Sequence, residues 1–529
     1  MTSFLRAQCL ALTMGALVTP SVLAQEEAPK LVVMLIVDQL RGDLLDRYEP
    51  AFSGGFRRLL DEGFRFTQAS HAHARTSTAP GHATLTTGVF PSRHGVVANS
   101  WFYDLDGEWR LSYAVADPPN GIVGFENVAA LEGRSPVTML REGLPDWLHA
   151  QDDDSRRISI SKKDRAAIPM GGQTSEHVYW LLPELGRFIT SRHYMRRYPR
   201  WLDRFNDRVM PDIADDRTWE SEVPQQFRAL ARPDAAVYEG DGVHTMFPHV
   251  GAEEVAEDHE QARNLWGFDQ SRVDDAVMAL AHEVIDEFDL GQRRELDFLA
   301  ISLSATDRVG HAFGPFSQEQ LSNLINVDQL LGEFFEYLDE EVGEGAWLVG
   351  LAGDHGVVTI PEAQVELGIN PDAERISHAE RTALLAEALN QGVRAGGSPE
   401  EIAERVARLI EQRGLVAKAY THSELTRAEP ADSFAVLFQN SYYPGRPWGP
   451  LSRWGIEVRF EDGDLVGFPR GTNHETTYWY DRHVEMIFMG AGVESGASDA
   501  PVYTVDFAPT LAGLAGIPVP GDLDGRRIF

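Results

Sequence analysis

The sequence predicts an α/β fold in which helices flank a mostly parallel central sheet. Four continuous apolar runs of strand length occupy residues 31–37, 296–304, 346–352 and 484–490. Runs without polar alternation are typical of strands that are buried on both faces, as in parallel sheets. Amphipathic helical segments lie between the runs, and this alternation of strands and helices favours a layered α/β architecture.

Three of the predicted helices show periodicity or end signals clearly. Residues 272–288 carry apolar side chains at the helical spacing. Ser317 and Ser398 each stand where a helix N-cap is expected, with a Gln or a Glu three residues later. This spacing is the capping-box pattern, so both serines should mark the first turn of a helix.

Two stretches do not follow the alternation. Residues 171–290 are rich in aromatic, arginine and acidic residues, and residues 375–440 hold two helical patterns and a turn-rich connection. We expect both stretches to be insertions that cap the sheet. The catalytic core would then be divided into residues 25–170, 291–374 and 441–529.

The first 24 residues have the pattern of a secretory signal peptide. Arg6 precedes an apolar run from Cys9 to Val18, and small residues precede Gln25. The run is too short to span a bilayer, so we expect cleavage and a periplasmic or secreted protein. Cys9 is the only cysteine, and the exported chain would therefore have no disulfide and no thiolate ligand.

The formal net charge of −34 restricts the possible partners. Such a charge disfavours nucleic acid and stable association with an anionic membrane. No heptad pattern predicts a dimer, and we expect a monomer. The segment 187–208 has seven arginines; we expect a surface helix paired with nearby acidic residues, and the alternative is a cap that attracts anionic substrates.

Carboxylate and imidazole side chains follow three of the apolar runs. They are Asp38 after the first run, Asp307 and His311 after the second, and Asp354 and His355 after the third. Ligands of open α/β sheets bind outside the carboxyl ends of the strands, so these side chains should converge. Nitrogen and oxygen ligands without sulfur suit catalytic Zn²⁺, with Mn²⁺ or Fe as alternatives. Five such ligands exceed the needs of one zinc and indicate a two-metal site.

The segment HARTSTAPGHATLTTG, residues 73–88, is rich in hydroxyl groups. Ser and Thr are weak nucleophiles unless a base or a metal activates them. The sequence has no GxSxG elbow and no Ser-His-Asp order near this segment. A metal is therefore the expected activator of any nucleophile here.

These residues resemble the alkaline phosphatase superfamily, in its branch of type I phosphodiesterases and nucleotide pyrophosphatases. Within that branch the chain is most similar to the phosphate-irrepressible alkaline phosphatases of bacterial periplasms. The resemblance extends from Asp38 to the C-terminal TVDFAPTLAGLAGIPVPGDLDGR. It implies a metal-dependent phosphate monoester hydrolase that uses two Zn²⁺ ions, a phosphothreonine intermediate and small-molecule phosphate monoesters as substrates. A catalytically silent metal-binding protein is the alternative from another class.

The resemblance also implies roles for residues outside the strand ends. Thr78 in TAPGH would be the nucleophile, and Asn99 in HGVVANS would bind the phosphoryl oxygens. Lys163 and Arg165 in ISKKDR match a Lys-x-Arg pair that would clamp the same oxygens. Diesterases of this branch usually lack the pair. We therefore predict a monoesterase, with a phosphodiesterase or nucleotide pyrophosphatase on the same site as the alternative.

The metal ligands implied by the resemblance form two sets. One zinc would be held by Asp38, Thr78, Asp354 and His355, and the other by Asp307, His311 and His474. His474 lies in GTNHETTYWYDRH, which departs from the usual pattern because Glu475 replaces a common Gly. His483 is the alternative for this last ligand. His82, close to the nucleophile, is expected to support the site rather than to bind metal.

Overall fold

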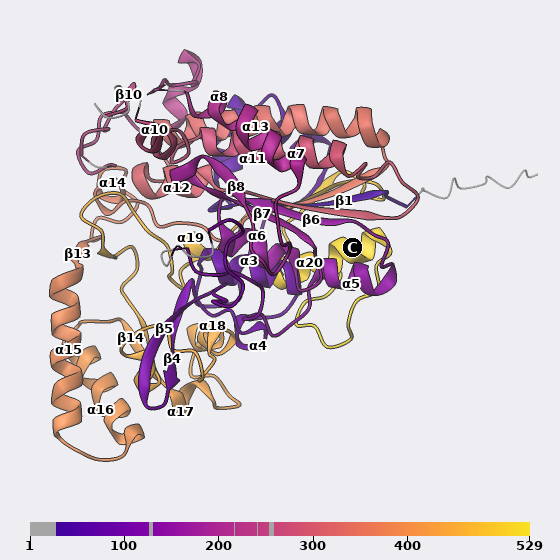
Figure 1. Ribbon diagram of the computed structural model, residues 1–529. Coiled ribbons are helices and arrows are strands. Elements are labelled where there is room, and N and C mark those ends of the chain that lie inside the picture. Colours follow the sequence, from indigo (N-terminus) through magenta and orange to yellow (C-terminus); the bar gives the residue numbers. More distant parts are fainter. Residues whose placement is uncertain (1–27, 126–127, 129–130, 216, 241, 253–258) are drawn as a thin grey trace, which may run out of the picture.

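The computed structural model describes residues 28–125, 128, 131–215, 217–240, 242–252 and 259–529 (Figure 1). The predicted signal peptide, residues 1–24, lies outside the described residues. Within the described part of the chain, no helix combines the length and the apolar character needed to cross a membrane.

A nine-stranded sheet forms the centre of the fold, with the strand order β18-β2-β17-β12-β1-β11-β6-β7-β8. In that order the strands are Gly496–Ser498, Phe64–Phe66, Met486–Gly490, Trp347–Ala352, Leu31–Val37, Asp297–Leu303, Arg157–Ser161, His177–Leu182 and Arg187–Ile189. The five neighbours β12, β1, β11, β6 and β7 run parallel to one another. The predicted mostly parallel sheet is therefore confirmed.

The fourth apolar run differs from the prediction in direction. Residues 484–490 contain the buried strand β17, but β17 pairs antiparallel with β12 and with β2. An apolar run reports burial on both faces of a sheet, and this burial is the same for either strand direction. The prediction of a parallel strand was wrong at this position for that reason.

Helices cover both faces of the sheet. Alternate side chains of β1 enter two separate hydrophobic clusters: Leu31, Val33, Leu35 and Val37 face one, and Val32, Met34 and Ile36 face the other. The first cluster is covered by α11 (Arg272–Glu287) and α13 (Gln318–Leu338). The second is covered by α5 (Leu144–Gln151) and α20 (Phe507–Ala515). The central strands are thus buried on both sides, as their continuous apolar sequences require.

The expected helix starts are present. The Ser317 hydroxyl accepts a hydrogen bond from the Gln320 backbone N–H at 3.0 Å, at the start of α13. Ser398 and Glu401 form the complete reciprocal capping box at the start of α16 (Pro399–Gln412). Both caps satisfy N–H groups that a helix leaves without partners in its first turn.

The segment 171–290 is not only a cap. Its strands β7 and β8 extend the central sheet beyond β6, and its helix α11 packs on that sheet. A strand as short as β8 has too few residues to produce a recognisable strand pattern in the sequence. The exact division of the chain at residues 170, 290, 374 and 440 stays a prediction.

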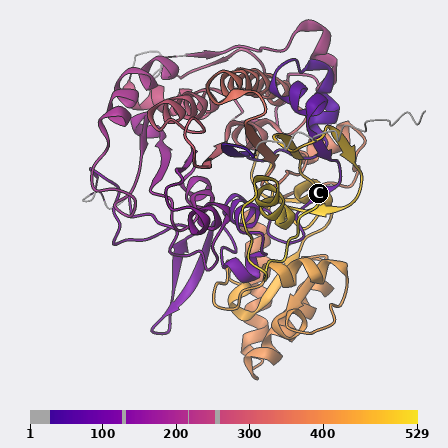
Figure 2. The ribbon, with the colours of Figure 1, turned by 90° about the vertical axis from the view of Figure 1, so that its right-hand side faces the viewer.

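The second atypical stretch forms a body beside the sheet, with a hydrophobic cluster of its own (Figures 1 and 2). It contains α15 (His378–Arg394), α16 and β14 (Lys418–Thr421). Its two-stranded sheet is completed by β15 (Ile456–Arg459), which lies beyond the expected boundary at residue 440.

The arginine-rich segment contains β8 and the amphipathic helix α7 (Arg200–Arg208). Trp201 and Phe205 of α7 are buried in the core. The Arg187 guanidinium contacts the carboxylates of Asp203 and Asp207 at 3.6 and 2.6 Å. These contacts agree with a surface segment that pairs with acidic residues.

A buried carboxylate on α13 caps the first turn of another helix. Asp328 accepts hydrogen bonds from the backbone N–H groups of Ser53, Gly54, Phe56 and Arg57, at 2.7–3.3 Å. These residues begin α2 (Gly55–Glu62), which has no side-chain cap of its own. The negative charge also lies where the dipole of α2 favours it.

We expect Asp328→Asn to lower the free energy of unfolding by about 1–3 kcal/mol. The amide has no negative charge, and its NH₂ group would face backbone N–H donors where the carboxylate oxygen now accepts. Denaturant titration of the purified protein measures this change. Asp61→Asn on the same helix is the matched control; its carboxylate is 62% exposed beside Arg57, so about 0.5 kcal/mol or less is expected. Equal effects of the two substitutions would contradict the capping role.

Candidate active site

The predicted ligand side chains converge at the carboxyl end of the parallel strands. Asp38 directly follows β1, and Asp354 and His355 follow β12. The helix α12 (Ala305–Phe313), which follows β11, carries Asp307 and His311. β12, β1 and β11 are neighbours in the sheet, so their ends bring these groups to one place.

Asp38, Asp354 and His355 form the first cluster, in which one donor atom of each residue lies within 4.8 Å of the others. All three side chains are fully buried. Asp38 Oδ1 and His355 Nε2 have no hydrogen-bond partner, and Asp354 Oδ2 lies 3.1 Å from His82 Nδ1. His355 Nε2 is 3.5 Å from both carboxylate oxygens. Buried polar atoms without partners are costly, and atoms grouped in this way fit a cation.

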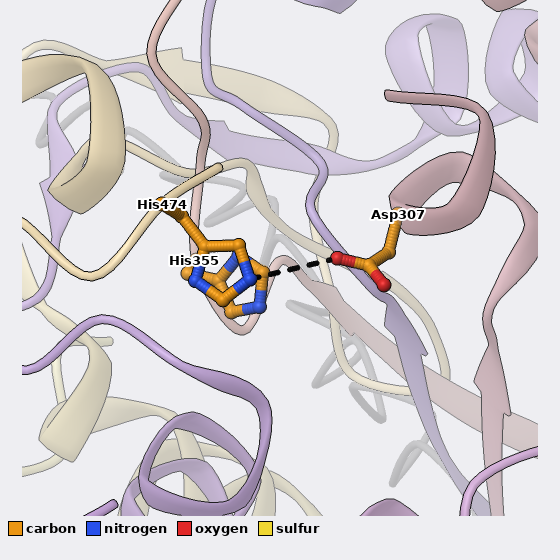
Figure 3. Close-up of side chains that lie close together, drawn as sticks. All are labelled: Asp307, His355 and His474. Atoms are coloured by element: carbon orange, nitrogen blue, oxygen red, sulfur yellow. Dashed lines mark ion pairs between the residues drawn. The ribbon is translucent and has the colours of Figure 1, made fainter. Parts of the chain in front are cut away.

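Asp307, His355 and His474 form the second cluster, so His355 belongs to both (Figure 3). His474 Nε2 lies 3.8 Å from Asp307 Oδ1, and the rings of His355 and His474 stack with centroids 3.7 Å apart. His311 adjoins this cluster, with Nε2 3.1 Å from Asp307 Oδ1. The two predicted ligand sets therefore share one site, in which His355 connects them.

The three histidines are oriented by the same kind of contact. The Nδ1 atoms of His311, His355 and His474 lie 2.9, 3.0 and 2.6 Å from the backbone carbonyl oxygens of Thr472, Gly356 and Thr76. An Nδ1–H that donates to a carbonyl leaves Nε2 as the unprotonated ligand atom. This arrangement is usual for histidines that bind metals.

His483, the alternative to His474, lies outside this group. Its Nε2 is 2.9 Å from the Thr67 carbonyl oxygen, and its ring stacks on Trp479. The structure therefore brings His474, and not His483, together with Asp307.

Thr78 is the first residue of α3 (Thr78–Thr87) and is 1% exposed. Asn99 Oδ1 accepts a hydrogen bond from the Ala79 N–H at 2.9 Å, which holds the Asn99 side chain against the start of the helix. Gly81 packs so closely against the Asp354 carbonyl that a Cβ there would collide with it. The Gly of TAPGH thus lets α3 approach the first cluster.

His82 supports this helix. Its Nδ1 lies 2.9 Å from the Thr78 carbonyl oxygen and 3.1 Å from Asp354 Oδ2, and its Nε2 lies 2.9 Å from Ser302 Oγ. Both ring nitrogens are therefore engaged by the protein. The expected supporting role fits this environment.

Lys163 lies between the two clusters. It precedes α6 (Asp164–Gly171) at the end of β6, and its Nζ is 2.5 Å from both Asp38 Oδ2 and Asp307 Oδ2. We expected this ammonium to face phosphoryl oxygens; here it contacts the ligand carboxylates, the nearest buried anions. Arg165, on the first turn of α6, donates to the Tyr113 hydroxyl at 3.5 Å.

The buried charges shift the pKa values of the site. Burial and the neighbouring carboxylates of Asp307 and Asp354 raise the pKa of Asp38. Burial opposes ionisation of Asp307 as well, but Lys163 and His311 hold its pKa well below the usual range. Burial together with His355 and His311 lowers the pKa of His474 and keeps its imidazole neutral. An ionised Asp307 and a neutral His474 are in the protonation states that metal binding requires. The raised pKa values of Asp38 and His311 favour the protonated forms, so a cation bound there would displace a proton.

Gln39 is a site residue that the sequence analysis missed. Its backbone N–H donates to Asp354 Oδ1, and its side-chain amide donates to Asp307 Oδ1, both at 2.9 Å. One residue thus holds a carboxylate of each cluster. This reach needs an uncommon backbone conformation, with φ at +67°, and a Gly at position 310, where a Cβ would collide with the Gln39 amide oxygen.

An open cleft of about 860 Å³ leads to these residues. Thr78, Asn99, Arg165, His311 and His474 line it. The cleft opens Thr78 and the second cluster to solvent.

Comparison with known proteins identifies relatives over nearly the whole chain. A family model described as type I phosphodiesterase / nucleotide pyrophosphatase matches residues 32–431. The alkaline phosphatase PhoV of Synechococcus elongatus is 31% identical, over 97% of this chain and 95% of its own length. The alkaline phosphatase PafA of Elizabethkingia meningoseptica is 29% identical, over 97% of both chains.

Solved structures agree with the sequence comparison. The crystal structure of wild-type alkaline phosphatase PafA superimposes with a TM-score of 0.82 at 26% identity, covering 95% of this chain and 98% of that chain. A PafA variant with four substitutions, of a Thr, an Asn, a Lys and an Arg, gives a TM-score of 0.84 with the same identity and coverage.

We expect Gln39→Met to weaken metal binding by about 10–100-fold, because both ligand carboxylates depend on this residue for their orientation. Competition with a chelator, followed by metal analysis of the protein, measures the change without relying on activity. Gln68→Met is the matched control, since the Gln68 amide is exposed and bonds only to the Thr67 carbonyl. Unchanged metal retention in both variants would contradict the role of Gln39.

Proposed function

Since the chain belongs to the type I phosphodiesterase and nucleotide pyrophosphatase family, and its relatives over nearly the whole length are alkaline phosphatases, we propose that it is an alkaline phosphatase, a hydrolase of small-molecule phosphate monoesters. The observation that carries the proposal is that Thr78 lines one cleft with Asp307, His311 and His474, while Gly81 on the same helix packs against Asp354 of the first cluster. A hydroxyl beside such clusters is suited to attack a phosphoryl group.

Thr78 acts as the nucleophile. Its hydroxyl oxygen attacks phosphorus, the P–O bond to the organic group breaks, and the organic group leaves as an alcohol once its oxygen is protonated. Water then breaks the phosphothreonine bond, which returns the Thr78 hydroxyl and releases phosphate. Two in-line displacements give net retention of configuration at phosphorus.

Asn99, Lys163 and Arg165 hold the non-bridging oxygens of the phosphoryl group. Asn99 is fixed against the start of α3, and Arg165 projects into the same cleft. The planar guanidinium matches two phosphoryl oxygens, and the ammonium of Lys163 adds a second positive charge. Donors in fixed positions stabilise the charge of the transition state without reorganising. The four PafA substitutions fall on the same residue types that we assign here.

Two Zn²⁺ ions fit the donor set. One would be held by Asp38, Thr78, Asp354 and His355, and the other by Asp307, His311 and His474. The partnerless donor atoms of the first cluster and the anchored histidines support this assignment. Zinc in such a site supplies a Lewis acid that favours an ionised hydroxyl and neutralises charge on oxygen. The chain's own part is to hold these carboxylates and imidazoles together, with Asp307 ionised and His474 neutral.

The place of action and the assembly state complete the proposal. The enzyme acts in the periplasm or outside the cell, and the support is the signal-peptide pattern of residues 1–24. It acts as a monomer on freely diffusing substrates. Its net charge of −34 suits a protein that binds neither nucleic acid nor an anionic membrane surface.

We expect Thr78→Ala to lower kcat/KM for an aryl phosphate by roughly 10⁴-fold or more, as the loss of a nucleophile does in other hydrolases. Acid quenching of the reaction with a monoester labelled at phosphorus should then leave no label on the protein. Thr78→Ser keeps a hydroxyl and should retain the label. Ser77→Ala tests the adjacent buried hydroxyl; loss of label from this variant, with labelling of Thr78→Ala, would refute the assignment.

We expect the double variant Lys163→Ala/Arg165→Ala to lower kcat/KM for a monoester by about 10²–10³-fold. The effect on the matching diester should be much smaller, because a diester has one fewer anionic oxygen for the cations to hold. The control is Lys162→Ala, whose ammonium contacts Asp269 instead. Equal losses on both esters would show that the pair does not select monoesters and would favour the phosphodiesterase alternative.

A further inference from the structure

The cleft extends well beyond the groups that bind a phosphoryl moiety. Its volume of about 860 Å³ lies in the range of pockets that enclose whole organic ligands. Asn99 and Arg165 line it close to Thr78. The rest of the cleft is lined by a mixture of side chains, in which charged groups such as Arg308 and Arg470 alternate with apolar ones.

An apolar wall starts beside the second cluster. Val309 and Phe313 lie on α12, the helix that carries Asp307 and His311, and they line the same cleft. With Trp219 they form a small hydrophobic cluster that is separate from the main cores. The rings of Trp219 and Phe313 meet edge to face, with centroids 6.0 Å apart. The wall is largely aromatic, and its three side chains are 8% exposed or less, so it offers the edges of packed rings to the cleft.

An apolar rim continues this wall to the surface. Leu265 on α10 (Glu260–Gly267) and Phe468, in the loop that leads to His474, also line the cleft. Leu265 is 40% exposed and Phe468 is 46% exposed. Partly exposed apolar side chains that line the same cleft are typical of a binding surface.

We propose that this wall and rim bind the organic group of the substrate, and that the enzyme prefers phosphate monoesters with aromatic leaving groups. The inference rests on the proposed function. In-line attack by Thr78 places the leaving oxygen on the far side of phosphorus. With the phosphoryl group between Asn99 and Arg165, the organic group then extends along α12. Burial of a flat apolar group against Trp219 and Phe313 contributes binding without any further polar contact.

The test compares phenyl phosphate with 2-naphthyl phosphate, which adds apolar surface to the same reacting group. The variant is Leu265→Ser/Phe468→Ser, which alters the rim and leaves the wall and the catalytic residues intact. The control is Tyr103→Ser/Leu111→Ser in the hairpin of β4 (Ser100–Leu105) and β5 (Glu108–Tyr113). Those two side chains are 38% and 63% exposed and do not line the cleft.

We expect the parent and the control to favour the naphthyl ester in kcat/KM by about fivefold or more, and the rim variant to lose roughly five- to tenfold on that ester alone. The intrinsic reactivity of each ester is the same with every protein. The ratio of kcat/KM between variant and parent, taken for each ester, therefore measures the contact between the rim and the organic group. Competitive inhibition by inorganic phosphate, which fills only the phosphoryl site, should have the same constant in all three proteins.

Other outcomes separate this inference from the proposed function. Full monoesterase activity with equal use of both esters, or equal losses on both in the rim variant, overturns the aromatic subsite and leaves the phosphatase intact. A parent protein that hydrolyses neither ester when loaded with zinc overturns the proposed function, and the subsite with it.

Discussion

The structure depends on three carboxylates that are buried together at the edge of one sheet. Asp38, Asp307 and Asp354 are 4% exposed or less, and the Lys163 ammonium contacts the first two of them. Burying ionised groups this closely is unfavourable unless cations and donors compensate. Lys163, Gln39 and the neutral imidazoles provide part of that compensation. The donor atoms that still lack a partner, such as Asp38 Oδ1 and His355 Nε2, mark the place where a bound metal ion would be stabilised most.

The spacing of the sheet explains why these groups meet. Neighbouring strands lie about 4.8 Å apart, so side chains that follow adjacent strands start close enough to converge on one point. β1 lies between β12 and β11 in the sheet. Asp38 therefore stands between Asp354 on one side and Asp307 on the other. A strand order that separated β12 from β11 by more strands would have produced two unrelated acidic ends.

Much of this could be predicted from sequence because the signals are local. An apolar run followed by Asp marks the end of a strand, and this local pattern was enough to place Asp38 and Asp354 at the edge of the sheet. His474 lies in a loop without periodicity, and only the family resemblance distinguished it from His483. Gln39 gave no signal, because its role depends on a positive φ and on partners 268 and 315 residues away. The direction of β17 was hidden for a related reason: burial is encoded locally, whereas strand direction depends on the connection.

The two ends of the cleft belong to different parts of the chain. The cations that would hold the phosphoryl oxygens come from the turn after β6, whereas the apolar wall comes from α12 and from segments outside the central sheet. On the proposed function, a change in the turn after β6 would alter how the phosphoryl oxygens are held without touching the wall. Val309 and Phe313 of the wall share α12 with Asp307 and His311, whereas Trp219 lies outside that helix. Trp219 is therefore the wall position at which the preference for the organic group could change with the least disturbance of the proposed ligands.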